Sequence, residues 1–259
     1  MEKGALYGKV AVVTGSGRGL GKAYAMELAR AGAHVAITDR TLESSARFGE
    51  AASGEVVADE IRALGSKSGF YTADLCVPAQ IKGLVNEVLS DFGHIDIWVN
   101  NAGGDIGAQT PRPDPNDCID IKEEDIESVV SRNLMSTIYA CKYVGAHMRE
   151  RMQGKIINVG SIGAHLAMDT GVVYAACKLA VEQYTRCMAE QMRQYNVNVN
   201  CLAPGYAKSA RVFGTRDIPN QTGLTRLQSF AEPEDMAKMV LFLASPDSDR
   251  LTGETVVYW

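Results

Sequence analysis

Short apolar runs rich in β-branched residues alternate along this chain with longer segments in which apolar positions recur at helical spacing. The short runs have the length of β-strands and lie at Val10–Val13, Val35–Ile37, Phe70–Tyr71, Ile95–Val99, Ile156–Val159, Val197–Leu202 and Thr255–Val257. The longer segments predict helices at residues 19–31, 42–64, 79–92, 123–152, 172–195 and 233–244. Such alternation is typical of parallel strands joined by right-handed crossovers. The pattern therefore predicts an α/β fold, a doubly wound parallel sheet of about seven strands with helices on both faces.

Two segments are longer than this pattern needs. Residues 42–64 carry Gly49 and Gly54 inside a helical pattern, and residues 104–122 are polar and interrupted by prolines. Both are predicted to be surface excursions. The chain contains neither an internal repeat nor a proline- or serine-rich linker, so we expect one domain spanning residues 1–259.

Composition narrows the class of partner. The chain has 259 residues, 46% hydrophobic and 22% charged, which is ordinary globular usage. Its net charge of −5 argues against a face for nucleic acid or an anionic membrane. Six cysteines are scattered as in reduced cytosolic proteins, and no apolar run has the length of a signal peptide core or a membrane span. These features predict a soluble cytoplasmic protein with a small-molecule partner.

A glycine-rich turn follows the first predicted strand. It reads Thr14-Gly15-Ser16-Gly17-Arg18-Gly19-Leu20-Gly21 and leads into the first predicted helix. Glycines allow the backbone to approach a phosphate, and the start of a helix offers free N–H groups to an anion. A glycine-rich turn without a ligand is the alternative. The position of this one, between the first strand and the first helix, favours a nucleotide.

An acidic residue ends the second predicted strand. Asp39 follows the glycine-rich turn by about 20 residues, the distance at which a carboxylate accepts hydrogen bonds from the adenosine ribose hydroxyls. Such a carboxylate repels a 2′-phosphate, which favours NAD over NADP. Arg18 and Arg40 favour NADP instead, because either could reach a phosphate. The alternative is that both arginines are solvated or contact the pyrophosphate or adenine. We give the carboxylate the greater weight.

Polar residues also follow the next two predicted strands. Asp74 comes after the third strand, where its carboxylate could accept from the adenine amino group, and Asn100-Asn101-Ala102-Gly103 end the fourth. Each could be an ordinary turn residue. Their shared position after successive strands predicts that they line one crevice.

Three polar side chains follow the fifth predicted strand at a suggestive spacing. Ser161 comes directly after that strand, and Tyr174 and Lys178 lie four residues apart on a predicted helix, which places them on one face. A free tyrosine has a pKa of about 10, so acid–base work near neutrality needs a cation beside the phenol. Lys178 can supply that charge, and Ser161 can hydrogen-bond a substrate oxygen.

The full set of motifs resembles the short-chain dehydrogenase/reductase family, in its subgroup of about 250 residues with a Tyr-x-x-x-Lys active site, over essentially the whole chain. The matching residues are Thr14-Gly15-x-x-x-Gly19-x-Gly21, Asp74, Asn100-Asn101-Ala102-Gly103, Asn133, Ser161, Tyr174-x-x-x-Lys178 and Pro204-Gly205. The resemblance implies a single-domain Rossmann fold that binds NAD(P). Together with the strand ends, it predicts cofactor contacts from Gly15, Arg18, Gly19, Leu20, Asp39, Arg40, Asp74, Leu75, Asn101, Ala102, Gly103, Tyr174, Lys178, Pro204, Gly205, Ala207 and Ser209.

The resemblance also implies catalytic roles. Tyr174 would be the proton donor or acceptor at the substrate oxygen, Ser161 would orient that oxygen, and Lys178 would bind the nicotinamide ribose and stabilise the phenolate. Asn133 would hold a water of the proton relay through its main-chain carbonyl. Hydride would pass directly between the substrate carbon and the nicotinamide ring. Where the family usually has a threonine that contacts the carboxamide, this chain has Ser209, which keeps the hydroxyl.

The substrate pocket of this family forms from the segments after the catalytic serine, before the tyrosine and after Pro-Gly. Here those segments offer Ile162, His165, Met168, Thr170, Gly171, Tyr206, Arg211 and Phe213. Arg211 could bind a carboxylate, sulfonate or phosphate, or be solvated, and His165 could contact substrate or be exposed. Residues 104–122 could overhang the pocket as part of a lid. Their acids lack the pattern of a calcium loop, and we expect no metal site.

These features predict an NAD-dependent oxidoreductase that acts on CH–OH groups of a small, polar secondary alcohol or on its ketone. One alternative is an NADP-dependent reductase of acyl-carrier-bound 3-oxo chains, which would favour a basic residue at the position of Asp39. Another is a catalytically silent nucleotide-binding scaffold, which retention of Ser161, Tyr174 and Lys178 disfavours. The resemblance further implies a homo-oligomer, a tetramer or a dimer, assembled through the helices at 123–152 and 172–195.

Overall fold

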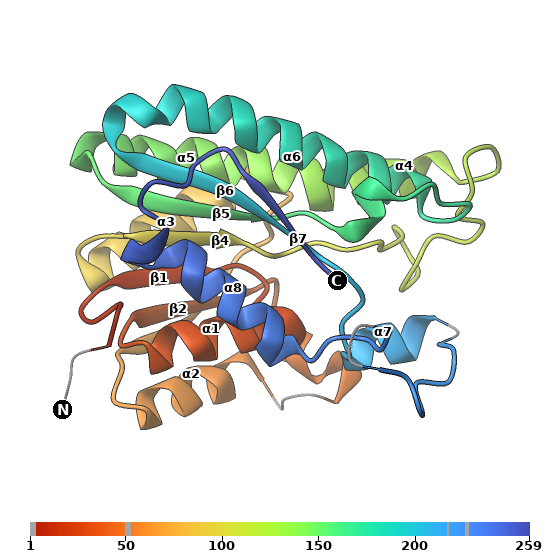
Figure 1. Ribbon diagram of the computed structural model, residues 1–259, viewed down its shortest axis with the longest axis horizontal. Coiled ribbons are helices and arrows are strands. Elements are labelled where there is room, and N and C mark those ends of the chain that lie inside the picture. The colour runs from red at the N-terminus through yellow and green to blue at the C-terminus, as the bar shows by residue number, and fades with distance from the viewer. Residues whose placement is uncertain (1–3, 50–52, 217, 226–227) are drawn as a thin grey trace.

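The computed structural model describes residues 4–49, 53–216, 218–225 and 228–259 and contains a sheet of seven parallel strands (Figure 1). The strands are β1 (Val10–Val13), β2 (His34–Asp39), β3 (Ser68–Thr72), β4 (Ile97–Asn100), β5 (Gly154–Val159), β6 (Val197–Pro204) and β7 (Thr255–Tyr258). Their order in the sheet is β3-β2-β1-β4-β5-β6-β7. All seven predicted strands are present, and the predicted doubly wound Rossmann-type fold is confirmed.

The sheet reverses its winding between β1 and β4, which pair directly. One half of the sheet grows outward from β1 to β2 and β3, and the other half grows from β4 to β7. Loops after β1 and β4 therefore separate above the sheet and leave a crevice at its carboxyl edge. The topology alone places the glycine-rich turn and the segment after Asn100 on the two sides of that crevice.

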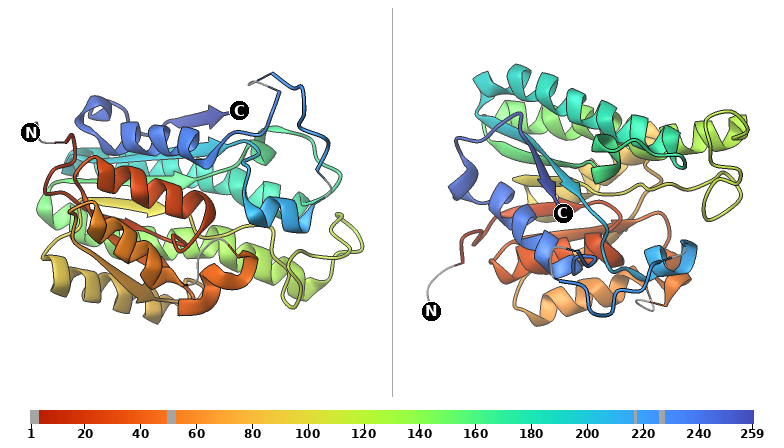
Figure 2. Two further views of the ribbon diagram at one scale, coloured as in Figure 1. Left: turned by 90° about the horizontal axis from the view of Figure 1, so that it is seen from below. Right: turned by 45° about the vertical axis from the view of Figure 1, so that its right-hand side comes forward.

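Helices cover both faces of the sheet (Figures 1 and 2). One face carries α1 (Gly19–Arg30), α2 (Gly54–Ala63) and α8 (Pro233–Ala244), and the other carries α3 (Pro78–Phe92), α5 (Ser136–Arg151) and α6 (Val172–Met192). Successive strand residues face opposite sides. Val13 accordingly joins the core under α1 and α8, while its neighbour Val12 joins the core under α3, α5 and α6.

The predicted helix at 42–64 is not one helix. A 3-10 helix, η1 (Leu42–Phe48), ends at Gly49, whose φ of +72° lies in the left-handed region that a helix cannot continue. The α-helix α2 begins at Gly54, where any side chain would collide with the ring of Phe70 on β3. The two glycines therefore separate two elements. Residues 50–52 of the predicted helix lie outside the described residues.

The predicted helix at 123–152 changes its winding in the middle. It consists of α4 (Glu123–Val130), a π-helical turn η2 (Ser131–Met135) and α5. Asn133 lies in this π-helical turn, and such turns are frequent at functional sites. The predicted helix at 172–195 ends in a 3-10 turn, η4 (Arg193–Tyr195), and one short helix, α7 (Ala210–Thr215), was not predicted.

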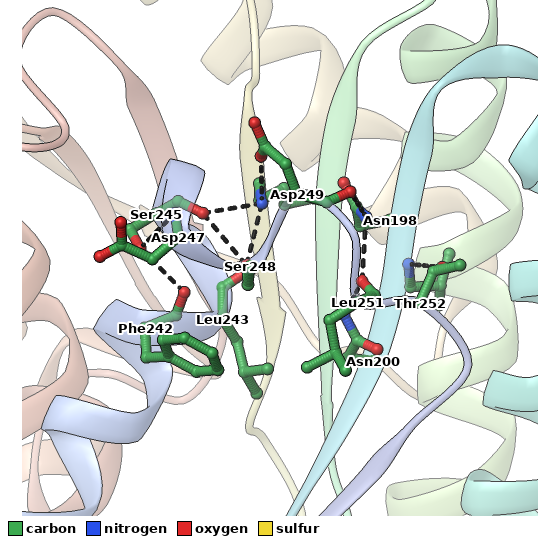
Figure 3. Close-up of polar contacts among 12 residues, drawn as sticks. Asn198, Asn200, Phe242, Leu243, Ser245, Asp247, Ser248, Asp249, Leu251 and Thr252 are labelled. Atoms are coloured by element: carbon green, nitrogen blue, oxygen red, sulfur yellow. Dashed lines mark hydrogen bonds and ion pairs between the residues drawn. The ribbon is translucent and has the colours of Figure 1, made fainter.

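Polar side chains of β6 hold the segment that leads into the edge strand β7. Figure 3 shows Asn198 donating to the carbonyls of Asp249 and Leu251, at 3.0 and 2.9 Å, while Asn200 donates to Leu251 at 2.9 Å. These contacts close the loop between α8 and β7. At the opposite end of β7, the carbonyl of Tyr258 accepts a 2.6 Å hydrogen bond from Gly205 N. The carboxyl end of the chain therefore supports the loop that follows β6.

Candidate active site

A cleft of about 920 Å³ opens at the carboxyl edge of the sheet. Residues that follow β1 to β6 line it, and α7 and the 104–122 segment project from the same end of the molecule (Figures 1 and 2). All the predicted cofactor-contacting residues line this cleft, and so does Ser161. The structure thus brings the predicted site residues together, apart from Asn133, which is fully buried beside the cleft.

The glycine-rich turn is shaped by close backbone approaches. Gly15 has a φ of +62°, and a side chain at Gly21 would collide with the carbonyl of Gly15 and the amide of Asn101. Only glycine fits position 21 for that reason. Helix α1 then begins at Gly19 without any side-chain hydrogen bond from its N-cap residue Arg18. Its first N–H groups carry the positive end of the helix dipole and suit an anion.

A set of hydrogen bonds ties this turn to the end of β4. The hydroxyl of Thr14 accepts from the main-chain N–H groups of Asn101 and Ala102, both at 3.0 Å. The Asn101 side chain donates in return to the carbonyls of Thr14 and Gly15, at 2.9 and 3.1 Å. The two sides of the crevice are therefore held at a set separation before any ligand binds.

Asp39 ends β2 with its carboxylate partly buried at the edge of the cleft. One carboxylate oxygen accepts a 2.8 Å hydrogen bond from the N–H of Arg40, whose side chain is exposed. Burial raises the pKa of Asp39 above its ordinary value, and the Arg40 N–H together with the nearby charge of Arg18 opposes that rise. The carboxylate thus lies beside two arginines, both of which line the cleft.

Asp74 also lines the cleft, after β3. One carboxylate oxygen accepts from the N–H of Cys76 at 2.9 Å, which is the local turn contact expected of an ordinary loop aspartate. The Cys76 side chain also forms a hydrogen bond with this carboxylate. The structure is therefore compatible with both interpretations of Asp74, as a turn residue and as an adenine contact.

Ser161, Tyr174 and Lys178 all line the cleft. The ammonium of Lys178 is buried, donates to the carbonyl of Val159 at 2.7 Å and lies 5.6 Å from the ring centroid of Tyr174. Ser161 caps the 3-10 turn η3 (Ile162–His165), and its hydroxyl accepts from Gly163 N at 3.1 Å. A hydroxyl that accepts locally still has its own hydrogen to donate.

Asn133 uses its side chain for structure. The side-chain oxygen accepts from Gly104 N at 2.8 Å, and the side-chain nitrogen donates to Gly104 O at 2.9 Å and Val129 O at 2.8 Å. The amide group is thereby committed to holding the chain after β4. The main-chain carbonyl accepts from the Thr137 hydroxyl at 3.0 Å, and it is the group of Asn133 that the side-chain contacts leave for a water.

The 104–122 segment is anchored by a buried carboxylate. One Asp105 oxygen accepts from Arg112 Nε and Asn116 Nδ2, both at 2.8 Å, while the other is buried without a hydrogen bond. Arg112 also reaches the Thr170 hydroxyl, and the Asn116 carbonyl accepts from Gly171 N at 2.9 Å. The segment is thus tied to the start of α6, and Gly104 to Thr110 line the cleft.

Sequence reasoning missed Asp105. Its only local signal was its place shortly after Asn101-Ala102-Gly103, and burial of its carboxylate depends on partners 7 and 11 residues away in an irregular loop. The expected surface excursion is therefore only half correct, because it contains a buried anchor and forms one side of the cleft.

The residues suggested for the substrate pocket divide into two groups. Ile162, Met168, Thr170, Tyr206 and Arg211 line the cleft. The other three lie elsewhere: His165 Nε2 is 2.9 Å from a carboxylate oxygen of buried Glu182, Gly171 caps α6 with a φ of +72°, and Phe213 is exposed. His165 is exposed to solvent, as the alternative to substrate contact predicted, and its hydrogen bond to Glu182 holds it outside the cleft lining.

Ser209 stands at the N-cap of α7 and lines the cleft. Its hydroxyl accepts from Val212 N at 3.3 Å, so its hydrogen remains available.

Within the described ranges, no cluster of histidine, cysteine and acidic side chains could hold a metal ion. No helix there is long and apolar enough to cross a membrane.

The fold, the switch-point cleft and the Ser161, Tyr174 and Lys178 set define the class: a nucleotide-binding oxidoreductase. A family model for short chain dehydrogenases matches residues 9–217, and the chain belongs to this family. The predicted membership is confirmed, and a nicotinamide dinucleotide, NAD or NADP, is the cofactor that this family binds.

Relatives of known activity match along almost the entire chain. A cyclohexanol dehydrogenase of Rhodococcus sp. (strain TK6) is 37% identical over 97% of this chain and 94% of its own. A solved 7α-hydroxysteroid dehydrogenase in complex with NADH and 7-oxo glycochenodeoxycholic acid is 27% identical, with a TM-score of 0.85 over 97% of this chain and 93% of that one. A short chain dehydrogenase of Burkholderia cenocepacia in complex with NADP is 28% identical, with a TM-score of 0.81 over 98% and 97%.

Proposed function

We propose that this protein is an NAD-dependent dehydrogenase/reductase that interconverts a small, polar secondary alcohol and its ketone, with Tyr174 as general acid and base. The observation that carries the proposal is the buried ammonium of Lys178, 5.6 Å from the ring centroid of Tyr174, in a cleft that Ser161 also lines. The cyclohexanol dehydrogenase and the hydroxysteroid dehydrogenase are both named for secondary alcohols on a ring. We expect a substrate of that kind.

The residues of the cleft fit a dinucleotide. The uncapped start of α1 suits the diphosphate, and the positions occupied by Gly15 and Gly21 let the turn pack without side chains. The carboxylate of Asp39, which has hydrogen bonds from the Arg40 N–H and the Ser44 side chain, would accept from the adenosine ribose hydroxyls. When bound, the cofactor supplies a nicotinamide ring that accepts or releases hydride.

The chain's own residues would handle the proton. The Ser161 hydroxyl donates to the substrate oxygen, and the phenol of Tyr174 takes or returns the proton there. The positive charge of Lys178, fixed by the Val159 carbonyl, favours the phenolate form during that transfer. Asn133 presents its carbonyl to a water that exchanges the proton with solvent. Ser161, Lys178 and Asn133 are held in place by hydrogen bonds that exist before the substrate binds.

The choice of NAD over NADP rests on Asp39, and two observations oppose that choice. Arg18 lies close enough to influence the charge of Asp39, and the relative from Burkholderia was solved with NADP. We propose that the partly buried carboxylate prevails, because a 2′-phosphate beside it would be repelled. Titration of the purified protein with NAD and with NADP tests this directly. Tighter binding of NADP would overturn the choice of cofactor and favour the acyl-carrier reductase alternative.

Activity is tested by following reduced cofactor at 340 nm with a panel of ring alcohols, polyols, sugars and hydroxy acids. We expect at least one ring alcohol to be oxidised. Cofactor binding with no turnover across the panel, in both directions, would favour a silent nucleotide-binding scaffold.

We further propose a cytoplasmic homo-oligomer, a tetramer or a dimer, assembled through α4, α5 and α6. Light scattering of the purified protein measures its mass.

A further inference from the structure

Arg211 reaches from the loop after β6 across the cleft. It lies in the first turn of α7, and its Nη2 donates to the main-chain carbonyl of Asp105 at 3.0 Å. The guanidinium fits so closely against Gly104 that a side chain at position 104 would collide with it. The arginine is partly buried and lines the cleft. Its charge is therefore held inside the site.

No carboxylate in the part of the chain that the structure describes forms an ion pair with this charge, although the Asp105 carboxylate is near enough to favour it. Arg211 forms no ion pair there, and the nearby carboxylate of Asp105 is already engaged by Arg112 and Asn116. Burial, together with the positive charges of Arg18 and Arg216, lowers the pKa of Arg211 to about 10, although Tyr174 and Asp105 oppose that fall. A guanidinium carries five N–H donors, and a buried charge without an opposite charge is costly. An anion that enters the cleft would relieve that cost.

The guanidinium lies on the substrate side of the cleft. It contacts the segment after β4 at Gly104 and Asp105, and it is close enough to Tyr174 for a charge on that phenol to favour the protonated arginine. Arg18, the N-cap residue of α1, also acts on the charge of Arg211, so the diphosphate position is within electrostatic range of the guanidinium as well. An anion at Arg211 would lie near Tyr174, where we expect the carbon that reacts.

We propose that Arg211 binds a carboxylate of the substrate, so that the alcohol is a hydroxy acid and its product an oxo acid. This inference rests on the proposed function, because it names the substrate class of the same site. The apolar part of such a substrate would contact Ile162 and Met168, and its acidic group would pair with the guanidinium in the two-pronged geometry that arginine favours. The cofactor diphosphate is the other anion that the guanidinium could meet.

Binding tests the proposal without turnover. Calorimetry with the NAD-loaded protein would compare cyclohexanecarboxylate with cyclohexanecarboxamide, which has the same ring and no charge. We expect the carboxylate to bind more tightly and Arg211→Gln to weaken its binding by about tenfold to a hundredfold, the range of a charged hydrogen bond. Arg211→Lys should restore part of the loss. Lys208→Gln is the matched control, because it removes a positive charge from the same loop at a residue paired with Glu232, outside the cleft lining.

Kinetics provide the second measurement. Wild type should oxidise 3-hydroxycyclohexanecarboxylate with a higher kcat/KM than its amide, and Arg211→Gln should abolish that preference by raising KM for the acid. Equal binding of carboxylate and carboxamide by wild type would overturn the inference, and so would an Arg211→Gln variant whose main loss is NAD affinity. Oxidation of the amide alone would refute the substrate class while leaving the proposed function intact. Carboxylate binding at Arg211 without turnover of any alcohol would support the carboxylate site and refute the proposed dehydrogenase function.

Discussion

The ammonium of Lys178 donates to the carbonyl oxygen of Val159 across 2.7 Å. This bond joins α6 to the end of β5, two residues before Ser161. Because Tyr174 lies one helical turn before Lys178, the same bond sets where the phenol stands relative to the serine hydroxyl. The strand end and the helix together position the proposed acid–base group.

Tyr174→Phe should lower kcat by about 10²- to 10⁴-fold, the usual contribution of a positioned acid or base. NAD affinity should change little, since the ring is retained and only the phenolic oxygen is lost. Steady-state kinetics and calorimetry measure the two effects. Tyr195→Phe, on the 3-10 turn at the far end of α6, is the matched control and should keep full turnover. Unchanged turnover in Tyr174→Phe would refute the mechanism.

The Asp39 carboxylate should make NAD binding depend on pH. Burial raises its pKa, so the folded protein takes up this proton at a higher pH than the unfolded chain does. The ionised form, which accepts from the ribose, is present above that pKa, and NAD affinity should fall as the pH decreases through it. Calorimetric titrations across a pH series check this for wild type and Asp39→Asn. The variant should bind NAD more weakly at neutral pH and show a flatter pH profile.

The raised pKa of Asp39 also affects the stability of the cofactor-free protein. Because burial disfavours the ionised carboxylate, Asp39 lowers the stability of the cofactor-free protein above its folded-state pKa, and protonation relieves that cost. Asp39→Asn should therefore unfold at the same temperature as wild type or a higher one at pH 7 without cofactor. Asp39→Ala should in addition relax the preference for NAD over NADP. A variant that stays strongly selective for NAD would show that another residue discriminates.

Gly21→Ala should weaken NAD binding by about tenfold, because forcing a methyl group against backbone costs about 1–3 kcal/mol and must displace the turn. The methyl group would meet the Gly15 carbonyl and the Asn101 amide, which hold the two sides of the crevice. Gly83→Ala is the matched control. Position 83 lies in α3 with open space around it, so alanine there should stabilise the fold by about 0.5–1 kcal/mol. Chemical denaturation and NAD titration distinguish the two variants.

Asp105→Ala should release the 104–122 segment. It removes the acceptor shared by Arg112 and Asn116 and should cost about 1–3 kcal/mol, the penalty for polar groups left without a partner. Arg112 keeps some access to solvent, which limits the loss. Denaturant unfolding measures the cost, and limited proteolysis should show faster cleavage within 104–122. Asp114→Asn, an exposed acid of the same segment, should behave as wild type.

Local pattern was sufficient for the strands and for the Tyr174 and Lys178 pair. Strand residues reveal themselves by β-branched content and short length, and a helical spacing of four residues puts two side chains on one face whatever surrounds them. The helix predicted at 123–152 shows where this reasoning ends. Its pattern is helical throughout, yet the chain forms a π-helical turn around Asn133, whose side chain pairs with Gly104, 29 residues away.

The sequence by itself determined the layered parallel sheet, the family and the set of residues that follow each strand, because hydrophobic period and motif spacing are properties of neighbouring residues. Only the tertiary structure decided that Asp105 is buried between Arg112 and Asn116, that His165 pairs with Glu182, and that Arg211 meets a carbonyl 106 residues away. Burial and electrostatic pairing arise where distant segments meet. The charge of the substrate side of the cleft therefore became visible only in the folded chain.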